Sequence, residues 1–142
     1  MAKLAIHGGP KAAERLQVPS WPMYDEEDKK AVLDVLEDRH WCRLYPGSRV
    51  EAFEKAYAEY QDARYGIAVS NGTVALELAL LACGIRPGDE VLVPAVTFIA
   101  SASAIVRVGA VPVFVDSDPE TLSISPAGIE AAITERTRGV VA

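Results

Sequence analysis

Val69-Ser70-Asn71-Gly72-Thr73-Val74-Ala75-Leu76 is the most informative part of the sequence, because an expected apolar strand is followed there by an expected apolar helix. The first N–H groups of a helix lack partners within the helix and point along a dipole that favours an anion. Gly72 would let the backbone approach a phosphate closely, and Thr73 would add a hydroxyl donor. Two plainer interpretations exist, since Asn-Gly is a common hairpin turn and Asn can simply cap a helix. The helical pattern after Thr73 argues against the hairpin and leaves the anion site and the simple cap both open.

Short apolar runs alternate with helical stretches from Gly66 onward. We expect strands at 67–69, 91–93, 111–115 and from Gly139, and helices at 73–83, 98–108 and 126–133. This alternation is typical of an α/β fold with an open, mostly parallel sheet and helices on both faces. The helix from Thr73 carries Glu77 as its single charge. We therefore expect that helix to be packed inside the protein.

The chain before Gly66 has a different character. We interpret residues 1–24 as an irregular N-terminal arm, followed at Asp25–Asp28 by acids that favour the start of a helix. Ser48 and Glu51 fit a capping box that begins a second helix near Arg49. Residues 25–142 are then expected to form the N-terminal part of one α/β domain. Because the last strand pattern would be left uncovered, we expect a fragment of a longer polypeptide.

A second candidate position follows the next expected strand, in Val93-Pro94-Ala95-Val96-Thr97-Phe98. The carboxyl ends of the strands form the edge of an open α/β sheet at which ligands bind. An aromatic ring at this edge could lie flat against a planar heterocycle. Phe98 could equally be a core residue, and this alternative stays open.

Composition excludes several classes of function. The formal net charge of −6, without a basic run, argues against a nucleic-acid partner. The uncharged stretch Val91–Val106 is shorter than the roughly 18 to 20 residues that a bilayer requires, so no membrane partner is expected. Gly8-Gly9 interrupts the start before an export signal can form, and we expect a cytoplasmic protein. Asp116-Ser117-Asp118 could hold a metal but is better explained as turn chemistry, so no metal site is predicted.

Five stretches together resemble one family of enzymes, the DegT/DnrJ/EryC1/StrS family of pyridoxal-phosphate-dependent, fold type I aminotransferases that act on sugars and cyclitols. They occur in the order and spacing of that family at residues 50–54, 70–77, 87–91, 93–100 and 109–116. Trp21-Pro22 and Trp41-Cys42-Arg43 are similar to the branch that contains aminohydroxybenzoate synthase and the cyclitol aminotransferases. The resemblance covers the chain from about Trp21 to Ala142.

The resemblance implies a function and a cofactor, pyridoxal 5'-phosphate. Asn71, Gly72 and Thr73 would bind the cofactor phosphate, and Phe98 would stack on its pyridine ring. Trp41 and Arg43 would belong to a loop that faces the substrate. The whole protein would be a homodimer that transfers an amino group from glutamate or glutamine to a keto sugar or cyclitol ketone.

The resemblance also implies what these residues lack. In the family a lysine from a later loop forms the Schiff base and an aspartate on a later strand pairs with the pyridine nitrogen, and neither position occurs here. Lys3, Lys11, Lys29, Lys30 and Lys55 lie in the arm or on the outer faces of the first two helices. We therefore expect no catalytic residue among these 142 and no activity from them alone, with the rest of the large domain and a small C-terminal domain absent.

Two other functions remain open. A pyridoxal-phosphate-dependent sugar dehydratase of the same family would have histidine in place of that lysine. A non-catalytic or nucleotide-binding α/β module is the other alternative, although no Gly-x-Gly-x-x-Gly follows a strand.

Overall fold

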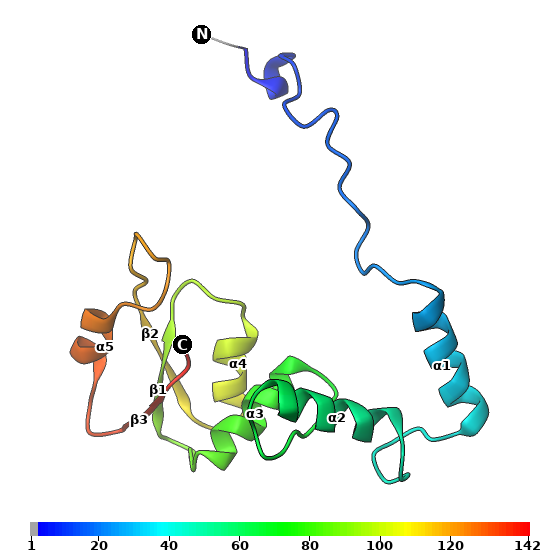
Figure 1. Cartoon of the computed structure of the whole chain (residues 1–142). Helices are drawn as coiled ribbons and strands as arrows, with labels where there is room; N and C mark the ends of the chain where they lie inside the picture. The colour runs from blue at the N-terminus through cyan, green and yellow to red at the C-terminus, as the bar shows by residue number, and fades with distance from the viewer. Residues whose placement is uncertain (1–2) are drawn as a thin grey trace. The chain divides into compact units, whose positions relative to one another are not determined.

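A computed structural model describes residues 3–142 of the chain (Figure 1). The chain divides into two compact units, a first unit that ends at Gly66 and a second unit that runs from Ile67 to Ala142. Each unit is described by itself. Among the described residues, no helix has the length and apolar character that crossing a membrane would require.

The first unit contains a short 3-10 helix, Ala5–His7, and two α-helices, α1 (Glu26–Asp38) and α2 (Arg49–Tyr60). Asp25 caps α1, because its carboxylate accepts from the N–H groups of Glu27 and Asp28 while Asp28 accepts in return from the N–H of Asp25. The acids expected to start this helix therefore do so through a complete capping box.

The cap of α2 departs from its expected form. Ser48 Oγ accepts from the N–H of Glu51 at 3.2 Å, as predicted. The Glu51 carboxylate does not return to Ser48, because it accepts from the N–H of Gly47 at 2.7 Å. Only one of the two bonds of the predicted capping box is therefore present. The bond from Gly47 to Glu51 instead fixes the residue before the cap.

The second unit is an open parallel sheet between helices. Its elements in chain order are α3 (Gly72–Ala82), β1 (Glu90–Pro94), α4 (Ala100–Arg107), β2 (Val111–Val115), α5 (Pro126–Ala132) and β3 (Thr137–Val140). The strand order is β2-β1-β3, and β1 pairs in parallel with both neighbours. The predicted α/β class with a parallel sheet is confirmed.

The core of this unit lies between the sheet and the helices α3 and α4. Leu80 of α3, Val91 and Val93 of β1, and Ala104 and Ile105 of α4 are buried together. Val91 and Val93 are two residues apart and so point to the same face of the strand. Burial of this face holds the helices that carry the candidate site.

The opposite face of the sheet is covered by α5. Leu92 alternates with Val91 and Val93 and is fully buried, and Val115 of β2 is also buried. A Cβ atom placed on Gly128 of α5 would lie only 2.7 Å from Val115 Cγ1, so α5 packs directly on this strand. Figure 1 shows α5 and α4 on opposite sides of the strands, which confirms helices on both faces.

Two expectations for the second unit are wrong. Residues 67–69 form no strand within the described chain, and Ile67 is exposed. A strand needs a paired neighbour, and none of β1, β2 and β3 pairs with residues 67–69 within the described chain. Helix α3 is not fully packed inside either, because Leu80 is buried while Leu78 and Leu81 are exposed.

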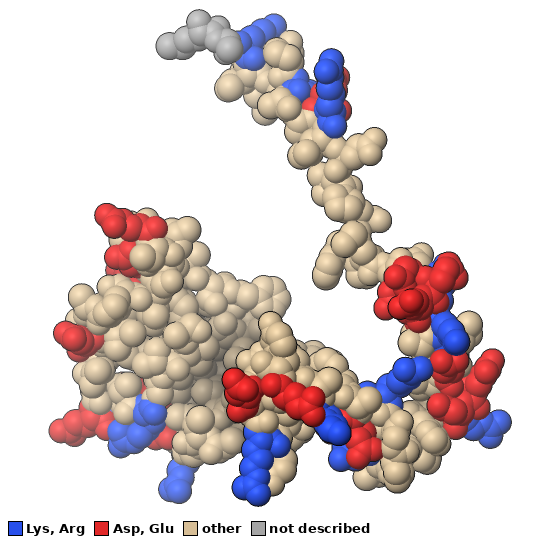
Figure 2. Space-filling model, in the orientation of Figure 1, with Lys and Arg blue, Asp and Glu red and all other residues tan. Residues whose placement is uncertain are grey.

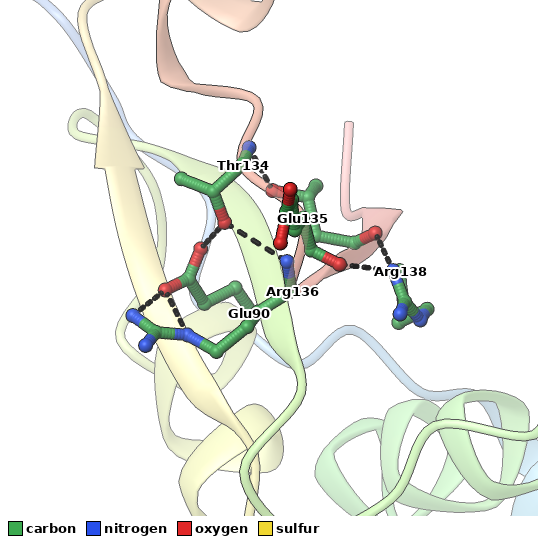
Figure 3. Close-up of polar contacts among 6 residues, drawn as sticks. Glu90, Thr134, Glu135, Arg136 and Arg138 are labelled. Carbon is green, nitrogen blue, oxygen red and sulfur yellow. Dashed lines mark hydrogen bonds and ion pairs between the residues drawn. The ribbon is translucent and has the colours of Figure 1, made fainter.

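A carboxylate cluster joins the strands at the amino edge of the sheet (Figure 3). Glu90, at the start of β1, is buried and accepts from Thr134 Oγ1 at 2.5 Å and from Arg136 Nε at 2.9 Å. The hydrogen bond from Thr134, followed by the bond and charge of Arg136, lowers the pKa of Glu90 below its ordinary value of 4.5. This cluster ties β1 to the segment that leads into β3, at the end of the sheet away from the candidate site.

Candidate functional site

The candidate site begins at the amino end of α3. Asn71 has extended backbone angles and is the N-cap, its Oδ1 accepting from the N–H of Val74 at 3.0 Å. Its backbone carbonyl accepts from the N–H of Ala75 at 3.1 Å. The Asn71-Gly72 step therefore starts a helix, and the hairpin interpretation is excluded.

Two donors at this helix end are unused. The cap provides partners for the N–H groups of Val74 and Ala75. The N–H groups of Gly72 and Thr73, which precede them, have no hydrogen-bond partner among residues 3–142. A Cβ atom at Gly72 would meet nothing within 4 Å, so the space beside this backbone is open. Unpaired amides at a helix start, with open space before them, are suited to an anionic group such as a phosphate.

Phe98 lies in the loop between β1 and α4, close after the carboxyl end of β1. It precedes α4, which begins at Ala100, so the predicted helix over 98–108 starts too early. Its side chain is 77% exposed, which excludes the core alternative. The Phe98 carbonyl accepts from the N–H of Ser101 at 3.0 Å, and this bond fixes its backbone to the first turn of α4.

A hydroxyl pair accompanies the ring. Thr97 Oγ1 and Ser101 Oγ lie 3.0 Å apart on either side of Phe98 in the sequence. Neither residue is among the site residues predicted from the sequence. Their four-residue spacing across the start of a helix is the signal that would have found them.

The other two predicted site residues belong to the first unit. Trp41 and Arg43 lie in the loop between α1 and α2, and the Trp41 side chain is 60% exposed. Arg43 Nε donates to Glu54 Oε2 at 2.6 Å, and its Nη2 lies 3.5 Å from Glu51 Oε1. These glutamates were also missed, although their three-residue spacing places them on one face of α2.

The Asp116-Ser117-Asp118 stretch leads into a turn at residues 119–121, and Asp118 caps that turn. Asp118 Oδ1 accepts from the N–H groups of Thr121 and Glu120 and from the Thr121 hydroxyl. These bonds, with the Thr121 N–H first, lower the pKa of Asp118. No group of three or more His, Cys, Asp or Glu within residues 3–142 is arranged to hold a metal ion.

Comparison with known proteins gives the family of the chain. The profile of the DegT/DnrJ/EryC1/StrS aminotransferase family matches residues 22–142. The chain belongs to this family. The predicted family membership, made from the five stretches of sequence, is thereby confirmed.

Relatives within the DegT/DnrJ/EryC1/StrS family support the cyclitol branch. The chain is 44% identical over 144 residues to the L-glutamine:scyllo-inosose aminotransferase of Streptomyces griseus, covering 98% of this chain and 34% of that protein. It is 43% identical to the 3-amino-5-hydroxybenzoate synthase of Amycolatopsis mediterranei, covering 88% of this chain and 32% of that protein. The chain thus spans about a third of the length of these relatives.

Solved structures of the family share the fold. The crystal structure of 3-amino-5-hydroxybenzoic acid synthase superposes with a TM-score of 0.81 at 44% identity, covering 87% of this chain and 32% of that one. NtdA of Bacillus subtilis, solved with bound cofactor PMP, gives a TM-score of 0.74 at 38% identity, covering 87% of this chain and 29% of that one. The fold is therefore that of the fold type I aminotransferases.

Proposed function

We propose that the protein is a pyridoxal-phosphate-dependent aminotransferase that transfers an amino group from glutamine or glutamate to a keto sugar or cyclitol ketone. Residues 1–24 form an arm in this proposal, and residues 25–142 form the N-terminal part of the cofactor domain. Because the relatives are about three times as long, the whole protein's catalytic lysine is assigned to the length that these residues do not span. The second unit supports this assignment, since Ile67–Ala142 contains no lysine.

The unused donors at the start of α3 carry the proposal. The N–H groups of Gly72 and Thr73, with the Thr73 hydroxyl, bind the cofactor phosphate, while Asn71 holds the helix start in shape through Val74. Their donor chemistry fits a phosphate, and the open space at Gly72 lets it approach. Phe98, exposed beside the carboxyl end of β1, stacks on the pyridine ring.

The bound cofactor would supply the electron sink that amino transfer requires. The residues of this chain bind and orient it. A helix start fixes the phosphate end, and an aromatic ring fixes the tilt of the heterocycle, so the two contacts together restrict its rotation.

The substrate assignments rest on the relatives. The name of the Streptomyces griseus relative contains glutamine as donor and scyllo-inosose as acceptor, which supports a glutamine donor and a cyclitol acceptor here. The loop that carries Trp41 and Arg43 is assigned to the acceptor. A cytoplasmic homodimer is part of the proposal, and the exposed aromatic stripe of Phe53, Tyr57 and Tyr60 on α2 supports a partner surface.

The experiment is an assay of the full-length protein with pyridoxal phosphate, L-glutamine and scyllo-inosose, in which the aminocyclitol is detected by mass spectrometry. We expect an aminated product whose formation depends on added cofactor and on glutamine. A protein that binds the cofactor but aminates neither a cyclitol ketone nor a nucleotide-linked keto sugar would contradict the proposed function.

A further inference from the structure

We propose that Arg43 is a positioning residue that pins the loop of residues 39–48 to α2 and thereby holds Trp41 toward the keto substrate. This inference rests on the proposed function, which assigns the loop to the acceptor. It assigns different tasks to the two predicted substrate residues. Trp41 contacts the keto substrate, and Arg43 affects substrate binding by holding Trp41 in place.

The guanidinium of Arg43 is already engaged by α2. Its Nε donates to Glu54 Oε2 at 2.6 Å, and Nη2 lies 3.5 Å from Glu51 Oε1. The Glu54 side chain is only 13% exposed, and a carboxylate so far removed from water requires a charged or hydrogen-bonding partner. A planar fork that meets two carboxylates is suited to arginine, whereas a lysine would provide a single point charge.

The remaining contacts of the loop lie within the loop or at its two ends. Within it, the rings of His40 and Tyr45 stack with centroids 5.1 Å apart, and the N–H of Tyr45 donates to the Cys42 carbonyl at 3.3 Å. Near α2, the N–H of Gly47 donates to Glu51 at 2.7 Å and the N–H of Ser48 donates to Tyr45. Near α1, the N–H of Trp41 donates to the carbonyl of Arg39 at 2.9 Å. Among the contacts described for residues 3–142, Arg43 supplies the side-chain link from the middle of the loop to the body of α2.

Trp41 is held from the other side by α1. Its ring lines an apolar hollow with Val32, Val35 and Leu36 of α1, and more than half of the side chain stays exposed. Arg43 lies two residues further along. The loop is thus held between an apolar contact on α1 and an ion pair on α2, and removing the ion pair frees the segment that presents the indole.

A contact residue on a mobile loop binds more weakly, because the loop must be ordered when the substrate arrives. For Arg43→Ala we expect KM for the keto acceptor to rise about three- to tenfold. The glutamine half-reaction should stay within about twofold of that of the unchanged protein, since the loop is assigned to the acceptor.

The kinetic experiment compares Arg43→Ala, Glu54→Gln and the double variant in the full-length protein. Glu54→Gln keeps the arginine but removes the nearer of its two charged partners, so it should reproduce most of the rise in KM, and the double variant should be no worse than Arg43→Ala. Arg43→Lys should fall between the unchanged protein and Arg43→Ala. The matched control is Arg107→Ala, which removes an ion pair of similar exposure to Glu77 at 2.7 Å on α3 and α4 and should leave acceptor KM unchanged.

A second readout is independent of activity. In protein labelled with 5-fluorotryptophan, the fluorine resonance of Trp41 is identified as the one lost in Trp41→Phe. We expect this resonance to shift or change width in Arg43→Ala and Glu54→Gln, and to stay in place in Arg107→Ala.

Each outcome decides a different point. A Trp41 resonance that does not respond to either variant would overturn the pinning of the loop. A rise in KM for Arg43→Ala that Glu54→Gln does not reproduce would overturn the positioning role, because Arg43 would then contact the substrate itself. Failure of the unchanged protein to aminate any acceptor would overturn the proposed function, and with it the substrate role of the loop, while the resonance still tests the pinning.

Discussion

The donors at Gly72 and Thr73 are the residue-level basis of the account. The cap made by Asn71 satisfies Val74 and Ala75 and leaves the two preceding N–H groups unpaired among residues 3–142. An unpaired N–H that is exposed to water costs little free energy, because water hydrogen-bonds to it. The same N–H forms a stronger, charge-assisted hydrogen bond when an anion replaces the water. We therefore expect very few atoms to set the affinity for the proposed phosphate.

Thr73→Val tests the hydroxyl at this position. It removes one donor and keeps the shape of the side chain, so we expect the affinity for pyridoxal phosphate to fall about two- to tenfold. Ser103→Ala is the control, because the Ser103 hydroxyl donates to the Ile99 carbonyl within its own helix and should not affect the cofactor. Titration calorimetry measures both, and equal losses in the two variants would argue against a phosphate contact at Thr73.

Phe98→Leu tests the ring contact. Because the ring is largely exposed, the free energy of unfolding should change by no more than about 0.5 kcal/mol. Loss of stacking should weaken cofactor binding about two- to tenfold. Phe114→Leu, at another exposed phenylalanine, is the matched control for affinity, measured by the same titration. Unchanged affinity in Phe98→Leu would remove the ring from the site.

The lowered pKa of Glu90 leads us to expect that the stability of the protein depends on pH. Thr134 and Arg136 lower its pKa in the folded state, so its stabilisation is complete above the ordinary glutamate pKa and is lost as the pH falls through the lowered value. The melting temperature should therefore decline more steeply below about pH 4.5 in the unchanged protein than in Glu90→Gln. The exposed Glu130→Gln should keep the steep decline. Parallel curves for Glu90→Gln and the unchanged protein would contradict this role.

At the scale of elements, helix starts could be predicted because each depends on one local side chain. Ser48 caps α2 at the position that the sequence indicates, and the helices α1 and α5 are capped in the same way by Asp25 and Ser125. Strand formation depends on distant partners, and this is why 67–69 was expected as a strand but forms none in the described chain. The Arg43–Glu54 pair spans eleven residues and follows no helical or strand period, so no local pattern could reveal it.

The contact of α5 with the sheet yields a further prediction at this scale. In Gly128→Ala the new Cβ would meet Val115 Cγ1 at 2.7 Å, so the helix must shift away from β2. We expect a loss of about 1 to 3 kcal/mol in the free energy of unfolding, measured by urea denaturation. Adding Val115→Ala should recover part of that loss, since it makes room for the methyl group. Strict additivity of the two changes would contradict the proposed contact.

At the scale of the whole molecule, we propose that the sheet unit supplies the cofactor contacts and that the first unit supplies the substrate loop. Figure 2 shows that the face drawn for the second unit is largely uncharged, whereas acidic and basic side chains alternate along the first unit. The parallel topology could be predicted from the alternation of strands and helices, and the family from five stretches in order. The exposed face of α3 could not be predicted from the sequence. A helix with a single charge has the same sequence pattern whether one of its faces or both are covered by other parts of the protein.

We propose that the start of α3 and Phe98 together hold the cofactor, and a crystal structure of the full-length protein with pyridoxal phosphate would show whether they do. We expect phosphate oxygens about 3 Å from the backbone nitrogens of Gly72 and Thr73, with the Phe98 ring flat against the pyridine. A phosphate bound at another helix, or a pyridine ring that does not touch Phe98, would contradict it.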